Sequence, residues 1–372
     1  MTFEEARSQF PVLERFAYLN AGTNGPLARS TVDTMEAMLR QDVEQGRGGR
    51  PYFEQLVRLR DEARAALAAL LGVPADNVAL VSSTTNGCNI VLAGLDLGPD
   101  DEVVTTDVEH FGLLGPLFAS PARVRVAAVR DAPAERAPEL VLAAVTSKTR
   151  LIAISHVSWM TGNSLFPSRL RTETDVPILV DGAQSVGAID VDAGEFDFYT
   201  VSAQKWPCGP DATGALYVHE PEALRIAQPT YMSQVEYDVA GASFTPRAGA
   251  ARFDSVWIPL SALAGLLVAL EAAPDWQFER VAQMARRCRE RLVEAGYVDA
   301  IATEPEQAGL VTFAPRDEPA EVAARLYDAG VVVRDLPGTP WLRVSCGWWT
   351  SEEDLERLVE GLGVSSGQAG TK

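Results

Sequence analysis

The chain has 372 residues, of which 47% are hydrophobic and 22% charged, so it is long enough for a large core and for two domains. Lys and Arg number 32 against 51 Asp and Glu, which gives a formal net charge of -19. This acidic balance argues against nucleic-acid binding and against attraction to anionic membranes, because both need a basic face.

Hydropathy and the spacing of cysteines and histidines narrow the class of protein further. No apolar run approaches the roughly 20 residues that span a bilayer, and the acidic opening MTFEEARSQF lacks the basic-then-apolar order of a signal peptide. The four cysteines show no CxxC spacing and the three histidines form no HExxH motif, so neither a zinc site nor a disulfide framework is indicated. We therefore expect a cytoplasmic enzyme without a metal.

Strand-like and helix-like segments alternate over the first two thirds of the chain. Residues 54–72 place apolar side chains on one helical stripe, and residues 84–95 are typical of a helix opened by hydroxyl and amide side chains. Short, nearly continuous apolar runs predict buried strands at 78–83, 102–106, 124–129, 151–156, 177–182, 198–203 and 215–219. This alternation predicts an α/β fold with a mainly parallel seven-stranded sheet between helices.

The pattern restarts after Pro274, where a long apolar helix ends. A helix at about 277–295 is followed by strand GLVTFA, helix EPAEVAARLYDAG, strands VVVRD and WLRVS, and helix SEEDLERLVEGL. These elements predict a smaller C-terminal α/β domain. The expected organisation is an N-terminal arm (1–25), a large domain (26–274), a small domain (275–363) and a flexible tail (364–372).

Chemically informative residues follow the predicted strands, at the sheet edge where open parallel sheets bind ligands. They are Thr84 and Thr85, His110 and Phe111, His156 and Trp159, Asp181, and Lys205. Singly, each has an ordinary role as a helix cap, a turn residue or a solvated side chain. Together they match the needs of pyridoxal phosphate: an amine, a carboxylate for the ring nitrogen, a helix N-terminus with hydroxyls for the phosphate, and a flat side chain against the ring.

The strings LVDGAQSVG (179–187) and VSAQKWPCGPDATGALYV (201–218) resemble the class V branch of fold-type I pyridoxal-phosphate enzymes. That branch includes cysteine desulfurases, kynureninases, isopenicillin N epimerases and cystine C–S lyases. The resemblance extends from YLNAGTNGPL (18–27) to WLRVSCGWWTSEEDLERL (341–358), nearly the whole chain. It implies a homodimer with the active site at the subunit interface, with SFTPRAGAARFD (243–254) as an interface loop.

Carried over by position, the resemblance gives each site residue an expected role. Lys205 would form the Schiff base and Arg343 in WLRVS would hold the substrate carboxylate. The expected cofactor contacts are Asp181 on the pyridine nitrogen, Gln184 on the ring hydroxyl oxygen, Thr84, Thr85, Ser202 and Gln204 around the phosphate, and Phe111 against the ring, with His110 as its rival for that place.

Three departures from the family pattern matter. The string before the lysine is Ser-Ala-Gln, where relatives usually have Ser-Gly-His, and Gln204 cannot carry charge. Trp257 stands where relatives often supply a Thr to the phosphate of the other subunit. The stretch VVVRDLPGTPWLRVS has no cysteine where desulfurases carry their sulfur-accepting one, and Cys346 follows Arg343 in the wrong place.

These departures direct the choice of reaction. Strings such as HVSWMTG (156–162) and KWPCGP (205–210) look closest to cystine or cysteine C–S lyases. The favoured expectation is β-elimination of a sulfur leaving group from an amino acid, which yields pyruvate, ammonia and a thiol or persulfide. An aminotransferase or epimerase is the alternative, and a cysteine desulfurase is less favoured because a thiolate acceptor is missing.

Overall fold

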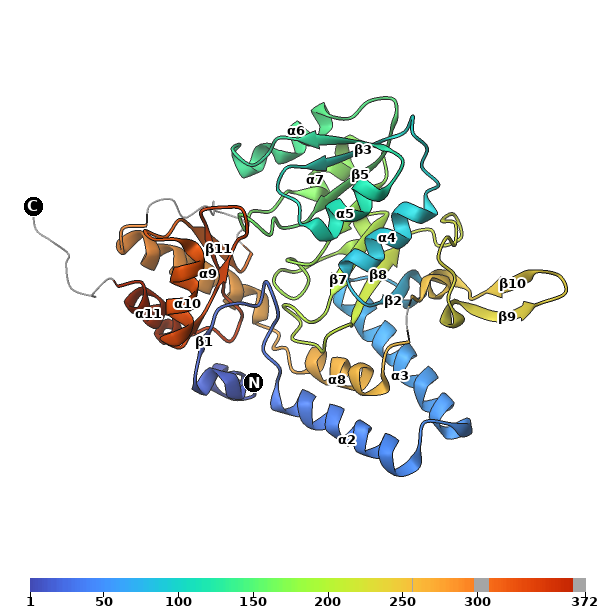
Figure 1. The fold of residues 1–372 in the computed structure, drawn as a ribbon, viewed down its shortest axis with the longest axis horizontal. Helices are drawn as coiled ribbons and strands as arrows, with labels where there is room; N and C mark the ends of the chain where they lie inside the picture. Colours follow the sequence, from blue (N-terminus) through green and yellow to red (C-terminus); the bar gives the residue numbers. More distant parts are fainter. Residues whose placement is uncertain (256, 298–307, 364–372) are drawn as a thin grey trace, which may run out of the picture.

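The computed structural model describes residues 1–255, 257–297 and 308–363. The expected tail at 364–372 lies outside these residues, as does most of the segment before the predicted strand GLVTFA. In Figure 1 the segments after α9 form a group on the left and the large sheet occupies the centre, while the β9–β10 hairpin projects on the opposite side.

The centre of the protein is the predicted seven-stranded sheet, in the order β2-β8-β7-β6-β5-β3-β4. Its strands are β2 (Val78–Val81), β3 (Glu102–Thr106), β4 (Arg123–Ala127), β5 (Thr149–Ser155), β6 (Ile178–Asp181), β7 (Phe198–Ser202) and β8 (Gly214–Val218). Neighbouring strands from β4 to β7 run parallel, whereas β8 is antiparallel to both β7 and β2. The expected mainly parallel sheet is confirmed.

Helices cover both faces of this sheet because successive strand side chains point to opposite sides. Leu80 and Val180 pack into the core shared with α3 (Gly49–Leu70), α6 (Ala137–Ala143), α7 (Pro167–Glu173) and α8 (Leu260–Glu271). Val81 and Leu179, one residue away, join the core under α4 (Thr84–Gly94) and α5 (Phe111–Ala119). The helix α2 (Arg29–Gln45) packs against α8.

A second, smaller unit follows α8. It contains α9 (Gln277–Glu294), β11 (Leu310–Phe313), α10 (Pro319–Asp328), β12 (Val331–Val332), β13 (Arg334–Asp335), β14 (Leu342–Ser345) and α11 (Glu352–Gly361). Strands β11, β14 and β13 form an antiparallel sheet in that order. The predicted single strand VVVRD is therefore two short strands in two different sheets.

The N-terminal arm is fastened to this smaller unit. It contains α1 (Phe3–Arg7) and β1 (Ala17–Tyr18), and β1 pairs in parallel with β12. Arg7 forms a 2.7 Å ion pair with the buried carboxylate of Asp354 on α11. After β1 the chain passes from the small unit to the edge of the large sheet.

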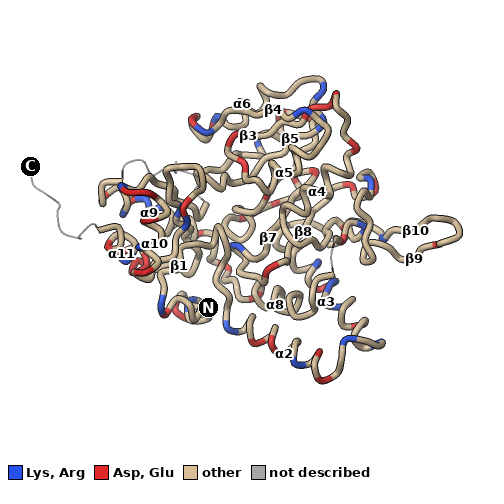
Figure 2. The backbone as a smooth tube through the Cα atoms, in the orientation of Figure 1, with Lys and Arg blue, Asp and Glu red and all other residues tan. Residues whose placement is uncertain are grey.

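Two segments for which the sequence predicted no helix or strand contain regular structure. Residues 49–52 of the QGRGGRPY stretch already belong to α3. Residues 229–247 contain the antiparallel hairpin of β9 (Gln234–Asp238) and β10 (Ser243–Pro246), which carries few charges in Figure 2. Across the residues that the structure describes, no helix combines the length and apolar character needed to cross a membrane.

Candidate active site

The site lies at the carboxyl edge of the parallel strands, where β6 and β7 end. Asp181 is the last residue of β6 and is only 3% exposed. Its Oδ1 accepts a 2.9 Å hydrogen bond from the backbone N–H of Ala183, which fixes the carboxylate at the sheet edge. Lys205 follows the adjacent strand β7, so the crossover brings both residues to one place.

Lys205 lies in a tight turn beyond β7. The turn is closed by a 3.0 Å bond from Cys208 N–H to the Lys205 carbonyl, and Cys208 has a left-handed φ of 56°. Burial lowers the pKa of the Lys205 amine to about 8, and Arg343 lowers it further, whereas Asp181 opposes the shift. Within the described ranges this amine makes no hydrogen bond and no ion pair, so it is available to react.

Hydroxyl groups gather at the positive end of α4. The helix begins at Thr84, and the Oγ of Ser202, at the end of β7, accepts a 3.1 Å bond from the Thr84 N–H. A Cβ added at Gly112 would come within 2.6 Å of Thr85 Oγ1, which places that hydroxyl at the start of α5. The Oε1 of Gln204 is buried without a partner among the described residues, and the amide of this side chain also carries N–H donors. Helix N-termini with free hydroxyls and amides suit a phosphate group.

The N-terminal arm closes one side of the site. Gln184 donates from Nε2 to the Gly22 carbonyl at 2.9 Å and accepts at Oε1 from the Trp206 indole at 3.0 Å. A Cβ at Gly25 would collide with the Lys205 carbonyl and lie 2.9 Å from Cys208 Sγ. The arm therefore passes this close to the lysine turn because glycine has no side chain.

His110 and Phe111 occupy different surroundings at the start of α5. The Nδ1 of His110 caps the helix by accepting a 3.0 Å bond from Gly112 N–H, so its neutral ring carries the proton on Nε2. Burial, and then the charge of Lys205, lower the pKa of His110. Phe111 is 73% exposed and lies over Gly115 of its own helix.

Arg343 reaches the same site from β14 of the smaller unit, and it is 2% exposed. Its Nη1 donates to the Trp159 carbonyl at 3.0 Å and its Nη2 to Thr23 Oγ1 at 3.2 Å, while its Nε is buried without a partner. No carboxylate among residues 1–255, 257–297 and 308–363 forms an ion pair with it. Burial, and then Arg334, lower its pKa to about 10.

The sequence reasoning missed Glu109, which is buried beside Asp181. The Glu109 carboxylate accepts hydrogen bonds from Thr106 Oγ1 at 2.6 Å, from Ser155 N–H at 3.0 Å and from Ser155 Oγ. Ser155 is the register partner of Asp181. Burial raises the pKa of Glu109 to about 7, and Asp181 adds to the rise. The signal was present: an acidic residue directly before His110, at the end of a buried strand.

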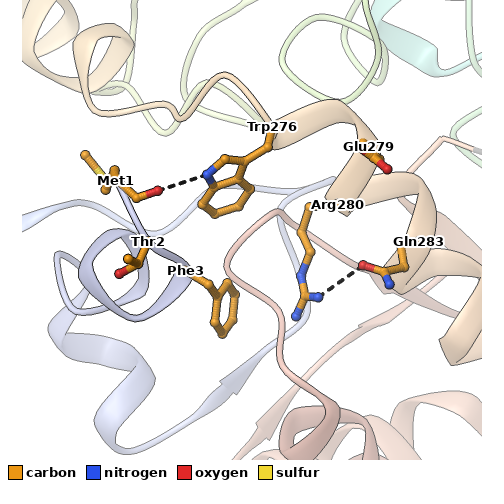
Figure 3. A pocket seen from close by; sticks show the side chains of 7 residues that line it. All are labelled: Met1, Thr2, Phe3, Trp276, Glu279, Arg280 and Gln283. Atoms are coloured by element: carbon orange, nitrogen blue, oxygen red, sulfur yellow. Dashed lines mark hydrogen bonds between the residues drawn. The ribbon is translucent and has the colours of Figure 1, made fainter.

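A separate cavity of about 320 Å³ lies between α1 and α9, as Figure 3 shows. Its lining is Met1, Thr2, Phe3, Trp276, Glu279, Arg280 and Gln283. Arg280 lies 4.5 Å from the centre of the Phe3 ring and donates to Gln283 and to the Thr350 carbonyl. These contacts hold α1 against the smaller unit. None of the residues that line the cavity comes from the sheet edge where Asp181 and Lys205 lie.

Comparisons with known proteins agree over nearly the whole chain. The family model "Aminotransferase class-V" matches residues 17–358. An isopenicillin N epimerase from Streptomyces clavuligerus is 26% identical over 98% of this chain and 99% of its own length. A probable cysteine desulfurase from Methanothermobacter thermautotrophicus is 24% identical over 97% of this chain and 98% of its own.

A solved structure also covers the chain almost end to end. The cystine C–S lyase C-DES, in complex with its reaction product cysteine persulfide, superimposes with a TM-score of 0.86 and 27% identity over 95% of this chain and 99% of its own. A variant of C-DES with glycine covalently linked to the pyridoxal-phosphate cofactor gives a TM-score of 0.87, also at 27% identity, over 96% of this chain and 98% of its own.

The protein is a fold-type I enzyme, and it belongs to the class V aminotransferase family. Its cofactor is pyridoxal phosphate, as the sequence predicted. The residues at the sheet edge fit this cofactor: an unpartnered amine at Lys205, a carboxylate at Asp181, and hydroxyls at the N-terminus of α4.

Proposed function

We propose that this enzyme catalyses β-elimination of a sulfur leaving group from cystine or another S-substituted cysteine. The products are pyruvate, ammonia and a thiol or persulfide, and one water is consumed without net oxidation. The proposal is supported by the likeness to C-DES over nearly the whole chain. The observation that carries it is the burial of the cysteines, which favours elimination over sulfur transfer to the enzyme.

All four cysteines are free and buried. Burial raises the pKa of Cys88 and of Cys208, and hydrogen bonding to Cys288, followed by burial, raises that of Cys346. A sulfur-accepting cysteine must be an accessible thiolate. All four thiols are covered, and the raised pKa values of Cys88, Cys208 and Cys346 keep those three protonated, which favours release of sulfur with the substrate fragment.

The residues around the cofactor have different roles. Bound pyridoxal phosphate supplies an electron sink for the α-carbon of the substrate. We assign Lys205 as the attachment point and general base, and Asp181 as the carboxylate that keeps the ring nitrogen protonated. The remaining contacts are Thr84, Thr85, Ser202 and Gln204 for the phosphate, Gln184 for the ring hydroxyl oxygen, and His110 in preference to Phe111 for the ring face.

Lys205 and Arg343 act on the substrate itself. The lowered pKa of the Lys205 amine, about 8, leaves roughly a tenth of it neutral at pH 7, compared with far less for an ordinary lysine, so it can take the α-proton. Arg343 holds the substrate carboxylate, because a buried cation without a carboxylate partner is satisfied by an anionic ligand. The electron pair of the broken C–H bond expels sulfur from the β-carbon as a thiolate or persulfide anion.

Amino-acid epimerisation is the second candidate. Isopenicillin N epimerases from Streptomyces clavuligerus and Amycolatopsis lactamdurans are 26% and 28% identical over 98% and 96% of this chain. Both reactions begin with removal of the α-proton, and they differ in what happens next. Transamination would follow the same first step.

One panel of substrates separates these reactions. Purified holoenzyme is incubated with cystine, S-substituted cysteines, cysteine and ordinary amino acids, and the products are quantified. Elimination predicts pyruvate in step with the released thiol or persulfide. Alanine as product would assign desulfuration, the D-isomer epimerisation, and a keto acid with pyridoxamine phosphate transamination.

The assignment of Lys205 is tested separately. The protein should be yellow, and borohydride should link the cofactor to the peptide that contains Lys205, while Lys205→Ala should lose that link. Lys148, in an exposed turn before β5, is the matched control and should remain unlabelled. Label on another lysine would overturn the assignment.

We also propose a cytoplasmic homodimer. The hairpin carries exposed apolar side chains, with Val239 83%, Val235 67% and Tyr237 66% exposed, and Trp257 lies nearby beside Tyr231. A second copy of the chain would cover this surface. The free cysteines suit a reducing compartment. Sedimentation at micromolar concentration should show a dimer, and an active monomer would refute the dimer.

A further inference from the structure

Trp159 occupies a rigid turn after β5, on the side of the site between His110 and Arg343. The turn is closed by Ser158, whose Oγ accepts from the N–H groups of Met160 and Thr161 at 3.3 and 3.2 Å. The carbonyl of Met160 also accepts a 2.7 Å bond from Thr312 on β11. The backbone of Trp159 is thus held by contacts on both sides.

Trp159 touches both functional neighbours at once. The indole meets the imidazole of His110 edge to face, with ring centroids 5.0 Å apart and an interplanar angle of 85°. Its carbonyl accepts the 3.0 Å bond from Arg343 Nη1. Trp159 therefore contacts the ring expected over the cofactor through its indole, and the cation expected at the substrate carboxylate through its backbone carbonyl.

The indole N–H of Trp159 is buried and has no hydrogen-bond partner in the described parts of the chain. The indoles of Trp206, Trp276 and Trp349, in contrast, donate to Gln184 Oε1, to the Met1 carbonyl and to the Tyr18 carbonyl. An indole nitrogen is a donor only, and a buried donor left unpaired is unfavourable. Such a group is tolerated at a site where a ligand supplies the acceptor.

Arg343 presents a second unpaired donor in the same place. Two of its nitrogens are already bonded to Trp159 and Thr23, while its Nε has no partner. A carboxylate has two oxygens and accepts several hydrogen bonds. The two orphan donors belong to residues that are bonded to each other, and one anionic group between them would satisfy both.

We propose that the indole N–H of Trp159 is a second donor to the substrate α-carboxylate, which Trp159 and Arg343 bind together. The inference rests on the proposed amino-acid substrate but not on which reaction follows. It makes Trp159 a binding residue that selects for the α-carboxylate, and it predicts that amines lacking this group lose the contribution of both donors.

The test compares L-alanine with ethylamine, which is the same molecule without the carboxylate. Neither can eliminate sulfur, so binding to the holoenzyme is read from the change in cofactor absorbance. Trp159→Phe keeps the ring against His110 and removes the N–H. L-alanine should bind about 10- to 100-fold more weakly, as expected for a lost hydrogen bond to a charged group, and ethylamine should bind as before.

Two controls isolate the effect. Trp276→Phe removes a paired indole N–H at the cavity of Figure 3 and should leave both affinities unchanged. In the cofactor-free protein, Trp159→Phe should lower the unfolding temperature less than Trp206→Phe, because both lose part of an indole but only Trp206 also loses a hydrogen bond. Trp159→Leu serves as a second variant if the phenylalanine variant folds poorly.

The outcomes are distinguishable. Equal loss of L-alanine and ethylamine affinity, or a lowered unfolding temperature with unchanged affinity ratio, would assign Trp159 a structural role and overturn the proposal. Unchanged L-alanine binding by Trp159→Phe would also overturn it while leaving the proposed function intact. A wild-type holoenzyme that binds no amino acid at all would refute the proposed function itself, and the role of Trp159 with it.

Discussion

Two buried arginine sites in this protein are built in opposite ways. Arg60 and Arg64 of α3 both donate to Asp254 Oδ2 at 2.8 Å, and Arg64 also donates to the Val78 carbonyl at 2.6 Å. The Oδ1 of Asp254 accepts from the Leu80 N–H at 2.8 Å. Arg343, equally buried, has a carbonyl and a hydroxyl as its acceptors and keeps its Nε unpaired.

The difference separates a structural charge from a binding charge. Burying a charge is costly unless it is paired and hydrogen-bonded, and the Asp254 cluster meets that condition within the fold. Through Asp254, this cluster links the segment before Trp257 to α3 and β2. Arg343 is hydrogen-bonded but has no carboxylate partner in the described residues. Its burial therefore destabilises the fold, and the same unpaired charge favours binding of an anion.

The largest expected effect is on the paired cluster. Asp254→Ala would leave the buried guanidinium groups of Arg60 and Arg64 without their carboxylate, which should cost about 3–5 kcal/mol in the free energy of unfolding. Urea denaturation measures this. Glu36→Ala, which breaks an exposed pair with Arg40 on α2, is the control and should change little. A loss of less than about 1 kcal/mol for Asp254→Ala would break the comparison.

Arg343→Ala should show the reverse pattern. It removes a charge-assisted contact to the substrate carboxylate, so kcat/KM should fall by about 30- to 1000-fold, equivalent to roughly 2–4 kcal/mol in transition-state binding. The free energy of unfolding should change less than for Asp254→Ala. Arg334→Ala, at the exposed register partner on β13, should retain activity. A destabilised Arg343→Ala protein with normal kcat/KM would make this arginine structural.

The buried carboxyl group of Glu109 should make the free energy of unfolding depend on pH. Its pKa is raised to about 7 by burial, with Asp181 adding to the shift, so the folded protein holds this proton between about pH 4.5 and 7 while the unfolded chain releases it. This contribution is therefore fully present below about pH 4.5 and is lost as the pH rises through 7, and it amounts to roughly 3 kcal/mol.

Glu109→Gln should remove that slope. The measurement is the free energy of unfolding of wild type minus variant, followed from pH 4.5 to pH 8. Glu102→Gln is the matched control, because Glu102 is a buried carboxylate at the start of β3 that is bonded to Thr146 and also has a cationic partner, Arg125. Parallel pH curves for wild type and Glu109→Gln would show that Glu109 titrates normally.

The sequence predicted the sheet because most of its strands are short apolar runs buried on both faces. The edge strand β4 was also expected to be buried, but most of its residues are exposed. The seven predicted runs correspond to the seven strands, and the fold class followed from their alternation with helices. Strand order and direction depend on long-range packing, so the antiparallel β8 was not foreseen. The β9–β10 hairpin was missed because its exposed residues do not alternate with a buried face.

The sequence predicted the candidate site as a set of residues and not as a geometry. Asp181 and Arg343 lie near enough to Lys205 to affect its pKa, but the choice between His110 and Phe111 depends on where α5 begins. Successive helical residues differ in direction by about 100°, so one residue decides which ring faces the site. The unpaired indole of Trp159 had no sequence signal, because its isolation depends on what surrounds it.

The smallest expected effect on turnover is that of replacing Cys346. This residue follows Arg343 in the sequence, so it is the thiol to test for sulfur transfer to the enzyme. It is fully buried against Cys288 in the core of the smaller unit, and its pKa is raised by hydrogen bonding to Cys288 and by burial. Cys346→Ser should leave pyruvate release within about twofold of wild type and lower stability by about 1–2 kcal/mol, because a hydroxyl replaces a thiol in an apolar core. Cys208→Ser replaces the buried thiol in the Lys205 turn, and its turnover and stability are compared with those of Cys346→Ser. A loss of turnover above tenfold in a Cys346→Ser protein that folds normally, with alanine replacing pyruvate among the wild-type products, would show that this buried sulfur reaches the substrate and that the enzyme is a desulfurase.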